Sequence, residues 1–170
     1  MPRIYVAILA AYNAAILHGA WIEAAQEPTD LVVEIQNMLK TCPEKGEEYA
    51  IHDFEDFFGY RVAEYESLKR VAKIAVLIEE HKTAFGAFLE LYPDEETDNL
   101  ESNFTDCFQG EYDDAEDYAA QFLEDSGLLA SIPETLRYYF DYKAYWRDLE
   151  LGGDIDSVSL DGKVYVFTVH

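Results

Sequence analysis

The sequence has no long apolar run, no paired-cysteine pattern and none of the common catalytic motifs. No stretch reaches the roughly 18–20 apolar residues that a membrane-spanning helix needs. The two cysteines, Cys42 and Cys107, form no Cys-x-x-Cys pattern, which is typical of a reduced cytoplasmic protein with two buried thiols. A phosphate-binding loop, a nucleophile elbow, a zinc-binding HExxH and a glycine-rich dinucleotide motif are all missing, so no motif indicates an enzyme class.

Basic residues are scarce. The 170 residues include 12 Lys and Arg against 35 Asp and Glu, for a formal net charge of −23, while 49% of the residues are apolar and 15% are aromatic. The apolar content predicts a folded core and not a disordered acidic tail. The charge excludes binding of DNA, RNA or an anionic membrane through a basic surface, because these ligands are themselves negative. Self-repulsion also destabilises such a chain, so we expect the charge to serve solubility, a high-salt habitat or a partner that prefers a negative surface.

The scarcity is greatest between Thr83 and Thr135, where 15 acidic residues occur and no Lys or Arg. Like charges on neighbouring helix turns are unfavourable, and side chains on successive turns lie about 5–6 Å apart. Duplex DNA carries one phosphate per roughly 1.7 Å of axis, counting both strands. Acidic helix turns can therefore imitate a phosphate backbone. Charge alone favours the simpler alternative of a solvated acidic surface.

Other candidate sites are weak. The four histidines lie far apart in the sequence, and His52, in an expected strand, fits a structural role better than that of a ligand or base. A glycosidase-like pair of carboxylates stays open, because the chain has too many acids to single out two. The segment 94–101 (DEETDNLE) is acidic like a calcium loop, but it lacks the glycine and the final glutamate at the required spacing.

Apolar periodicity, capping residues and turn patterns predict an α+β chain. The apolar start MPRIYVAILAAY is interpreted as a buried strand and not as a signal peptide. The expected elements are strands at 3–9, 18–24 and 48–54, helices at 29–40, 68–81, 83–92, 97–108, 113–125 and 142–150, and a closing hairpin of 155–160 and 163–169. The expected N-caps are Thr29, Ser67 and Asp141, and the expected capping-box pairs are Asp113 with Glu116 and Ser131 with Glu134. The hairpin is indicated most strongly, because Asp161-Gly162 separates two alternating strands.

Changes in character near residues 61 and 109 predict three small domains. Residues 1–61 are expected to form a sheet with one helix, residues 62–108 a helical domain, and residues 109–170 an α+β domain of helices plus the hairpin. The last domain holds six aromatic residues between Tyr138 and Trp146. Most are expected in the core, but a short helix cannot bury all six, so some are expected at a subunit interface, where Tyr and Trp are favoured.

Three long stretches resemble the ArdA-type antirestriction proteins. They are RIYVAILAAYNAAILHGAWIEA at 3–24, AIHDFEDFFGYRVAEYESLKRVAKIAVLIEEHKTAF at 50–85, and FQGEYDDAEDYAAQFLEDSGLLASIPETLRYYFDYKAYWRDLELGGDI at 108–155. The first has the YN…LHG…WI pattern of the family's opening. The last includes LLASIPETLRYYFDYKAYWRDLEL, which is similar to the family's antirestriction motif. The resemblance covers nearly the whole chain and keeps its order.

The resemblance implies a non-enzymatic DNA mimic, encoded on a mobile genetic element, that has no cofactor or metal. It implies an elongated chain of three small domains that forms a homodimer through the last one. The implied partner is a type I restriction-modification enzyme, bound in the DNA groove of its methyltransferase and specificity subunits, with no nucleic acid or membrane as partner. The carboxylates expected to imitate phosphates are Asp94, Glu95, Glu96, Asp98, Glu101, Asp106, Glu111, Asp113, Asp114, Glu116, Asp117, Glu124 and Asp125.

The dimer contact, or antirestriction-like motif, is expected to include Leu128, Leu129, Pro133, Tyr138, Tyr139, Phe140, Tyr142, Tyr145 and Trp146. Two other classes of function stay open beside the resemblance. One is an acidic hydrolase that uses paired carboxylates, and the other is a salt-adapted acidic protein of unrelated function.

Overall fold

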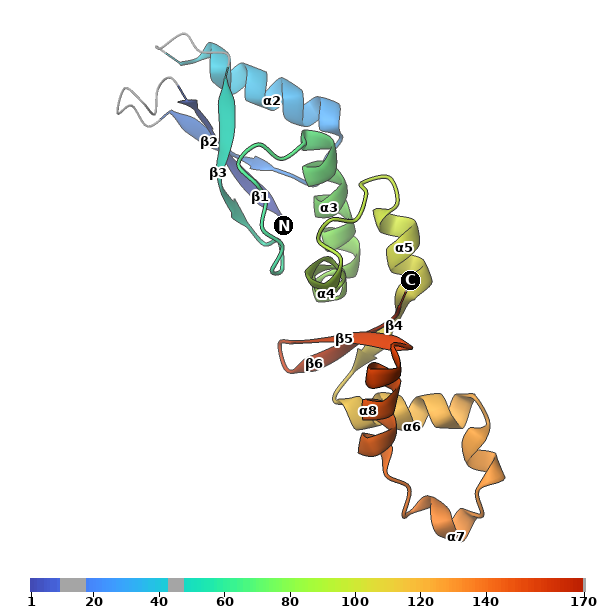
Figure 1. Ribbon diagram of the computed structural model, residues 1–170. Coiled ribbons are helices and arrows are strands. Elements are labelled where there is room, and N and C mark those ends of the chain that lie inside the picture. The colour runs from blue at the N-terminus through green and yellow to red at the C-terminus, as the bar shows by residue number, and fades with distance from the viewer. Residues whose placement is uncertain (10–17, 43–47, 170) are drawn as a thin grey trace. The chain divides into compact units, whose positions relative to one another are not determined.

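The computed structural model of the chain describes residues 1–9, 18–42 and 48–169 (Figure 1). The chain forms two compact units, Met1–Glu101 (unit 1) and Ser102–His170 (unit 2). Each unit has a three-stranded antiparallel sheet with helices, so the expected α+β class is confirmed. The expected boundary near residue 61 falls inside unit 1, and the three-domain division stays a prediction.

Unit 1 begins with the apolar segment that the sequence predicts to be a strand. β1 (Arg3–Ile8) is the central strand, and β2 (Gly19–Glu23) and β3 (Tyr49–Glu55) pair with it on either side. Ile4, Val6 and Ile8 are fully buried, as expected for a strand in the middle of a sheet. Asn13, which ends the apolar run in the sequence, lies outside the described residues.

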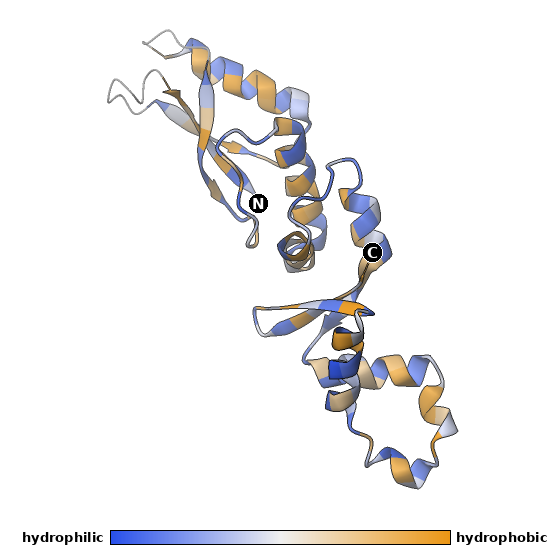
Figure 2. Cartoon of the chain, viewed as in Figure 1, coloured by the Kyte–Doolittle hydropathy of each residue, from blue (hydrophilic) through white to orange (hydrophobic). Residues whose placement is uncertain are grey.

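In the part of unit 1 that the structure describes, helices accompany the sheet. They are α2 (Pro28–Lys40), α3 (Leu68–His81), α4 (Thr83–Leu91) and the first residues of α5 (Leu100–Cys107). Figure 2 shows α2 and α3 with apolar and polar patches side by side, which is typical of helices that bury one face. The two phenylalanines of α4, Phe85 and Phe88, are fully buried, with ring centroids 5.8 Å apart.

Unit 2 pairs a β-hairpin with a strand from the start of the unit. Its elements after α5 are β4 (Phe108–Tyr112), α6 (Ala115–Asp125), η1 (Leu128–Ser131), α7 (Glu134–Arg137), α8 (Tyr142–Gly152), β5 (Ile155–Leu160) and β6 (Lys163–Thr168). The sheet order is β4-β6-β5. The core cluster that supports α6 and α8 contains Tyr118, Ala119, Trp146, Ile155 and Val166.

The hairpin turn is confirmed. Leu160 pairs with Lys163, and the two residues between them, Asp161 and Gly162, have φ angles of 51° and 77°. Two consecutive positive φ values are what a type I′ turn requires, and Asp-Gly adopts them at low cost.

The predicted boundaries of two helices are wrong. α2 is capped by Glu27 with Pro28 in its first turn, and not by Thr29, because proline is well suited to the first helical position. The helix expected from Thr97 or Asp98 through Phe108 spans only Leu100–Cys107. Phe108 instead opens β4, where it pairs with Phe167 of β6. Pairing with a distant strand therefore decides the end of this helix.

The capping residues of unit 2 are correct in one case and wrong in two. Asp141 caps α8 by accepting a hydrogen bond from the Ala144 amide at 2.9 Å, as expected. α6 is capped by Asp114, whose carboxylate accepts from the amides of residues 116 and 117, and not by Asp113. Ser131 does not pair with Glu134, because its hydroxyl donates to the Leu128 carbonyl within η1.

Two further capping and burial expectations are met in part. Ser67 does precede α3, but its side chain accepts no hydrogen bond from the helix. Of the two cysteines expected to be buried, Cys107 is buried and Cys42 only half-buried, and neither forms a disulfide. In the part of the chain that the structure describes, no helix is long and apolar enough to cross a membrane.

Candidate functional site

The acidic segment that follows α4 is held in place by Arg70 of α3. The guanidinium donates to the carbonyls of Pro93 and Glu95, at 2.7 and 2.5 Å. It also donates to the Tyr60 hydroxyl at 3.2 Å and lies 3.7 Å from the Glu66 carboxylate. The Arg70 side chain is only 13% exposed. The largely buried guanidinium of Arg70 therefore holds the backbone that carries the first acids of this segment.

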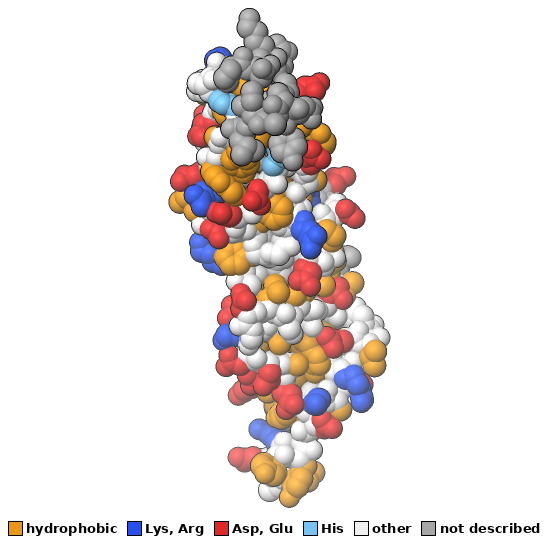
Figure 3. All heavy atoms as spheres, turned by 90° about the vertical axis from the view of Figure 1, so that its left-hand side faces the viewer, with side chains coloured by type: hydrophobic (Ala, Val, Ile, Leu, Met, Phe, Trp, Pro, Cys, Tyr) orange, Lys and Arg blue, Asp and Glu red, His pale blue; other side chains and the backbone are white. Residues whose placement is uncertain are grey.

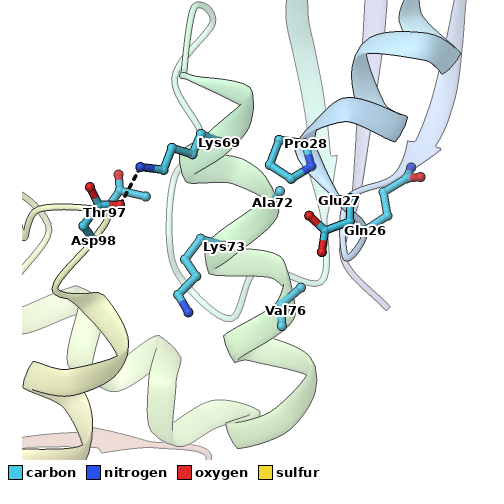
Figure 4. A pocket seen from close by; sticks show the side chains of 9 residues that line it. All are labelled: Gln26, Glu27, Pro28, Lys69, Ala72, Lys73, Val76, Thr97 and Asp98. Carbon is cyan, nitrogen blue, oxygen red and sulfur yellow. Dashed lines mark hydrogen bonds and ion pairs between the residues drawn. The ribbon is translucent and has the colours of Figure 1, made fainter.

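Two lysines on the same helix neutralise later acids of the segment. Lys69 forms an ion pair with Asp98 at 2.5 Å, and Lys73 forms one with Glu101. The hydrogen bond and the charge of Lys73 hold the pKa of Glu101 below its ordinary value. Figure 4 shows Lys69 reaching Asp98 beside a surface hollow of about 390 Å³, which Lys73 also lines.

Unit 1 therefore presents fewer unpaired carboxylates than the sequence suggests. Asp94 and Glu96 are exposed, and neither side chain forms an ion pair with any residue that the structure describes. Glu95 is half-buried. The sequence could not show the pairing, because Lys69 and Lys73 lie outside the stretch that lacks basic residues.

The acids between β4 and α6 in unit 2 also have structural partners. Lys163 of β6 lies 2.6 Å from the Asp113 carboxylate and 3.7 Å from that of Glu111. The hydrogen bond and charge between Lys163 and Asp113 lower the pKa of Asp113 and raise that of Lys163. The carboxylate of Asp114 is the N-cap of α6. Each of these three acids therefore has a partner within unit 2.

A second group of acids in unit 2 is exposed and forms no side-chain ion pair within the described ranges. It consists of Asp106 on α5 and Glu116, Asp117, Glu124 and Asp125 on α6. The first-turn pair, Glu116 and Asp117, interacts favourably with the positive end of the helix dipole. Glu124 and Asp125 lie in the last turn, where the dipole is negative and α6 has no basic residue. The fold gains nothing from acids at these two positions.

Both units are strongly negative. Unit 1 holds 20 acidic and eight basic residues, and unit 2 holds 15 and four. Figure 3 shows acidic side chains spread over the visible face, with few basic ones among them. In the stretches that the structure covers, no group of three or more His, Cys, Asp or Glu could hold a metal ion.

The antirestriction-like motif is divided between the core and the surface. Trp146 is buried in the core cluster, and Tyr142 and Tyr145 pack against it. Tyr138 and Tyr139 are 89% and 78% exposed, with their rings in an edge-to-face contact. The expectation that this aromatic group cannot all be buried is confirmed.

The rest of the motif is mostly accessible. Leu128 and Pro133 are exposed, and Leu129 and Phe140 are half-buried. Leu136, which is not among the residues predicted for the motif, is 54% exposed in α7. Figure 3 shows an apolar group at the bottom of the view, where Figure 1 places α7.

The family model described as antirestriction protein (ArdA) matches residues 4–162. The chain belongs to the ArdA family. The resemblance of the three long stretches is thereby confirmed, and the match includes the acids of both units and the whole antirestriction-like motif. Membership assigns an antirestriction function, the inhibition of restriction enzymes, and ArdA is not a family of known enzymes. No curated protein matches the chain.

Proposed function

We propose that this ArdA protein is a DNA mimic that occupies the DNA-binding groove of type I restriction-modification enzymes. Its exposed carboxylates take the place of phosphates and meet the Lys and Arg side chains that bind DNA in the groove. Inhibition is then competitive with duplex DNA and independent of DNA sequence, because phosphates carry no sequence information.

The observation that carries the proposal is the acid-only surface of α6. Asp117 and Glu124 are two turns apart on one face of the helix, which is about 10.5 Å along its axis. Phosphates on one DNA strand advance about 3.4 Å per step, so this separation corresponds to about three steps. Asp125 extends the negative surface beside Glu124. The like charges weaken the last turn of the helix, which is understandable if a cationic partner covers them.

The proposal is tested by competition with DNA. The purified protein is titrated into a type I methyltransferase bound to labelled duplex DNA, at about 50 and 200 mM salt. We expect stoichiometric displacement that weakens by at least tenfold at the higher salt, because contacts made through many charges are strongly screened. A folded protein that displaces no DNA at either salt would refute the proposal. Folding that requires molar salt would support the salt-adapted alternative.

A matched pair of variants tests whether α6 takes part. Asp117→Asn with Glu124→Gln removes two charges from α6, and Asp148→Asn with Glu150→Gln removes two from α8. We expect the α6 variant to inhibit about three- to tenfold less well, since exposed ion pairs contribute about 0.2–1 kcal/mol each. For the α8 variant, the logarithm of the fold loss of inhibition should be less than half of that for the α6 variant. Equal losses would show that only the total charge matters.

We also propose that the protein forms a homodimer through the exposed apolar part of the motif. Tyr138, Tyr139 and Leu136 are exposed in the monomer, and tyrosine is favoured at interfaces. Replacing Tyr138 and Tyr139 by Ser removes little from the core, so the variant should stay folded and sediment as a monomer where the unmodified protein sediments as a dimer. An unmodified protein that is monomeric throughout the micromolar range would refute this contact.

A further inference from the structure

A second surface hollow, formed within unit 2 by β4 and α6, combines aromatic rings with a carboxylate. Its volume is about 370 Å³, and its lining includes Tyr112, Tyr118, Gln121, Phe122 and Asp125. The four residues from α6 are spaced i, i+3, i+4 and i+7, so they fall on one face of the helix. One helix face thus supplies both an aromatic wall and the negative charge at its end.

The aromatic wall is rigid. Tyr118 is 4% exposed, and its ring meets that of Trp146 edge-on at 5.5 Å and that of Tyr112 edge-on at 5.1 Å. Phe122 stacks on Tyr118 with centroids 5.8 Å apart and is itself 38% exposed. The hydroxyl of Tyr112 donates to the carbonyl of Gln109 at 3.2 Å. The core therefore packs against these rings, and part of the Phe122 side chain is accessible to a ligand.

The hollow is electrostatically negative and has no cation of its own. No Lys or Arg is part of the lining that the structure describes. Asp125 is exposed, and its side chain forms no ion pair with a described residue. Burial raises the pKa of Tyr112, and the charge of Asp125 raises it further. The C-terminal end of the helix dipole adds negative potential.

We propose that this hollow receives an arginine side chain from the DNA-binding groove of the restriction enzyme. The guanidinium is planar and carries five N–H donors, so it can stack on Phe122 while it donates to the carboxylate of Asp125 and the amide oxygen of Gln121. Cation–π contact and carboxylate pairing act together on the same group. A lysine ammonium offers no flat surface to the ring, and arginine is therefore the expected occupant. The inference rests on the proposed function and names one of its contacts.

The first test compares two neighbouring acids in the competition assay. Asp125→Asn removes the carboxylate of the hollow, and Glu124→Gln removes the same charge one residue earlier, outside the lining. We expect about a five- to tenfold loss of inhibition for Asp125→Asn and about a two- to threefold loss for Glu124→Gln. Neither change should impair folding, because each removes an unfavourable charge from the last turn of α6. Equal losses for the two variants would overturn the proposal.

Phe122→Leu tests the ring. It keeps an apolar side chain but removes the aromatic face, and we expect about a threefold loss of inhibition. Combined with Asp125→Asn, the loss should be smaller than the product of the two single losses, because both side chains act on one guanidinium. Losses that multiply fully would show that the ring and the carboxylate act on different groups, which contradicts the proposal.

A direct probe separates this inference from the proposed function. Nα-acetyl-arginine amide at millimolar concentration should shift the backbone amide NMR signals of residues 121–126 in a saturable way. Nα-acetyl-lysine amide, whose side-chain ammonium is free, should shift them less. Asp125→Asn should weaken the response. If arginine binds here but DNA is not displaced from the enzyme, the mimic proposal fails and the cation site stands. If DNA is displaced but arginine and lysine amides give equal, unsaturable shifts, the site is refuted and the mimic proposal stands.

Discussion

Arg70→Met gives the sharpest test of how unit 1 holds its acidic segment. Methionine keeps most of the aliphatic stem of the side chain but removes every N–H donor. The change leaves the carbonyls of Pro93 and Glu95 without the guanidinium that binds them, and it leaves Glu66, whose side chain is 18% exposed, without its cation. The perturbation therefore affects one connected group of polar contacts.

The expected destabilisation is about 3 kcal/mol. A hydrogen bond to a charged group contributes about 1.5–3 kcal/mol, and contacts that share one guanidinium are not additive. The burial of Arg70 justifies the upper part of this range. Lys69→Met is the matched control, because the Lys69 and Asp98 side chains are 62% and 76% exposed. An exposed pair of this kind contributes about 0–1 kcal/mol.

Amide hydrogen exchange measures the difference at the segment itself. The Glu95 amide donates to the Tyr92 carbonyl and the Asn99 amide donates to the Glu96 carbonyl, so both report whether the segment opens. A loss of 3 kcal/mol corresponds to about hundredfold faster exchange when exchange requires opening. We expect this for Arg70→Met and no more than about fivefold for Lys69→Met. Equal exchange of these amides in the two variants would refute the argument that Arg70 fixes the segment.

Three other outcomes are expected. Gly86→Ala should destabilise unit 1 by about 1–3 kcal/mol, because a Cβ there would lie 2.4 Å from the Phe58 carbonyl oxygen. Urea denaturation measures the loss, and an unchanged midpoint would contradict this. Lys163→Met should raise the pKa of Asp113 back toward its ordinary 3.8 in a carboxyl NMR titration, and an unchanged pKa would show that Lys163 is not its cause. The pKa of Asp113 is lower in the folded state than its ordinary value, so the stabilisation from this pair is fully present at pH values above about 3.8. It is lost as the pH falls through the lower pKa of the folded state. Lys163→Met should therefore remove part of the acid sensitivity of unit 2.

The sequence predicts the elements whose periodicity is strong and local. The helix expected at 68–81 is observed as Leu68–His81, and the hairpin at Asp161-Gly162 forms as expected. β4 was missed because its existence depends on β6. Its first residue, Phe108, pairs with Phe167 and lies 5.1 Å from Phe104, ring to ring. Its five residues alternate between half-buried and exposed positions, but so short a segment between two helices is ambiguous from the sequence alone.

The ion pairs of the acidic stretch could not be predicted from the sequence, for an equally physical reason. The acids were identified from a stretch without basic residues, but four of them pair with lysines that lie outside it. Lys69 and Asp98 are 29 positions apart, Lys73 and Glu101 are 28 apart, and Lys163 is 50 positions from Asp113. Such partners are brought together only by the fold.

The placement of the basic residues also explains how so acidic a chain can present its charge to a partner. Several of its few cations are used inside their own unit. Arg70 donates to the backbone carbonyls of Pro93 and Glu95, and Arg137 donates to that of Ile132. Lys163 pairs with Asp113, between β4 and α6. These contacts hold the acid-bearing and motif segments in position. They also remove cations that would otherwise compete for the exposed carboxylates of α6, which no cation within the described residues neutralises. In the proposed function, these are the acids that meet the Lys and Arg of the DNA-binding groove.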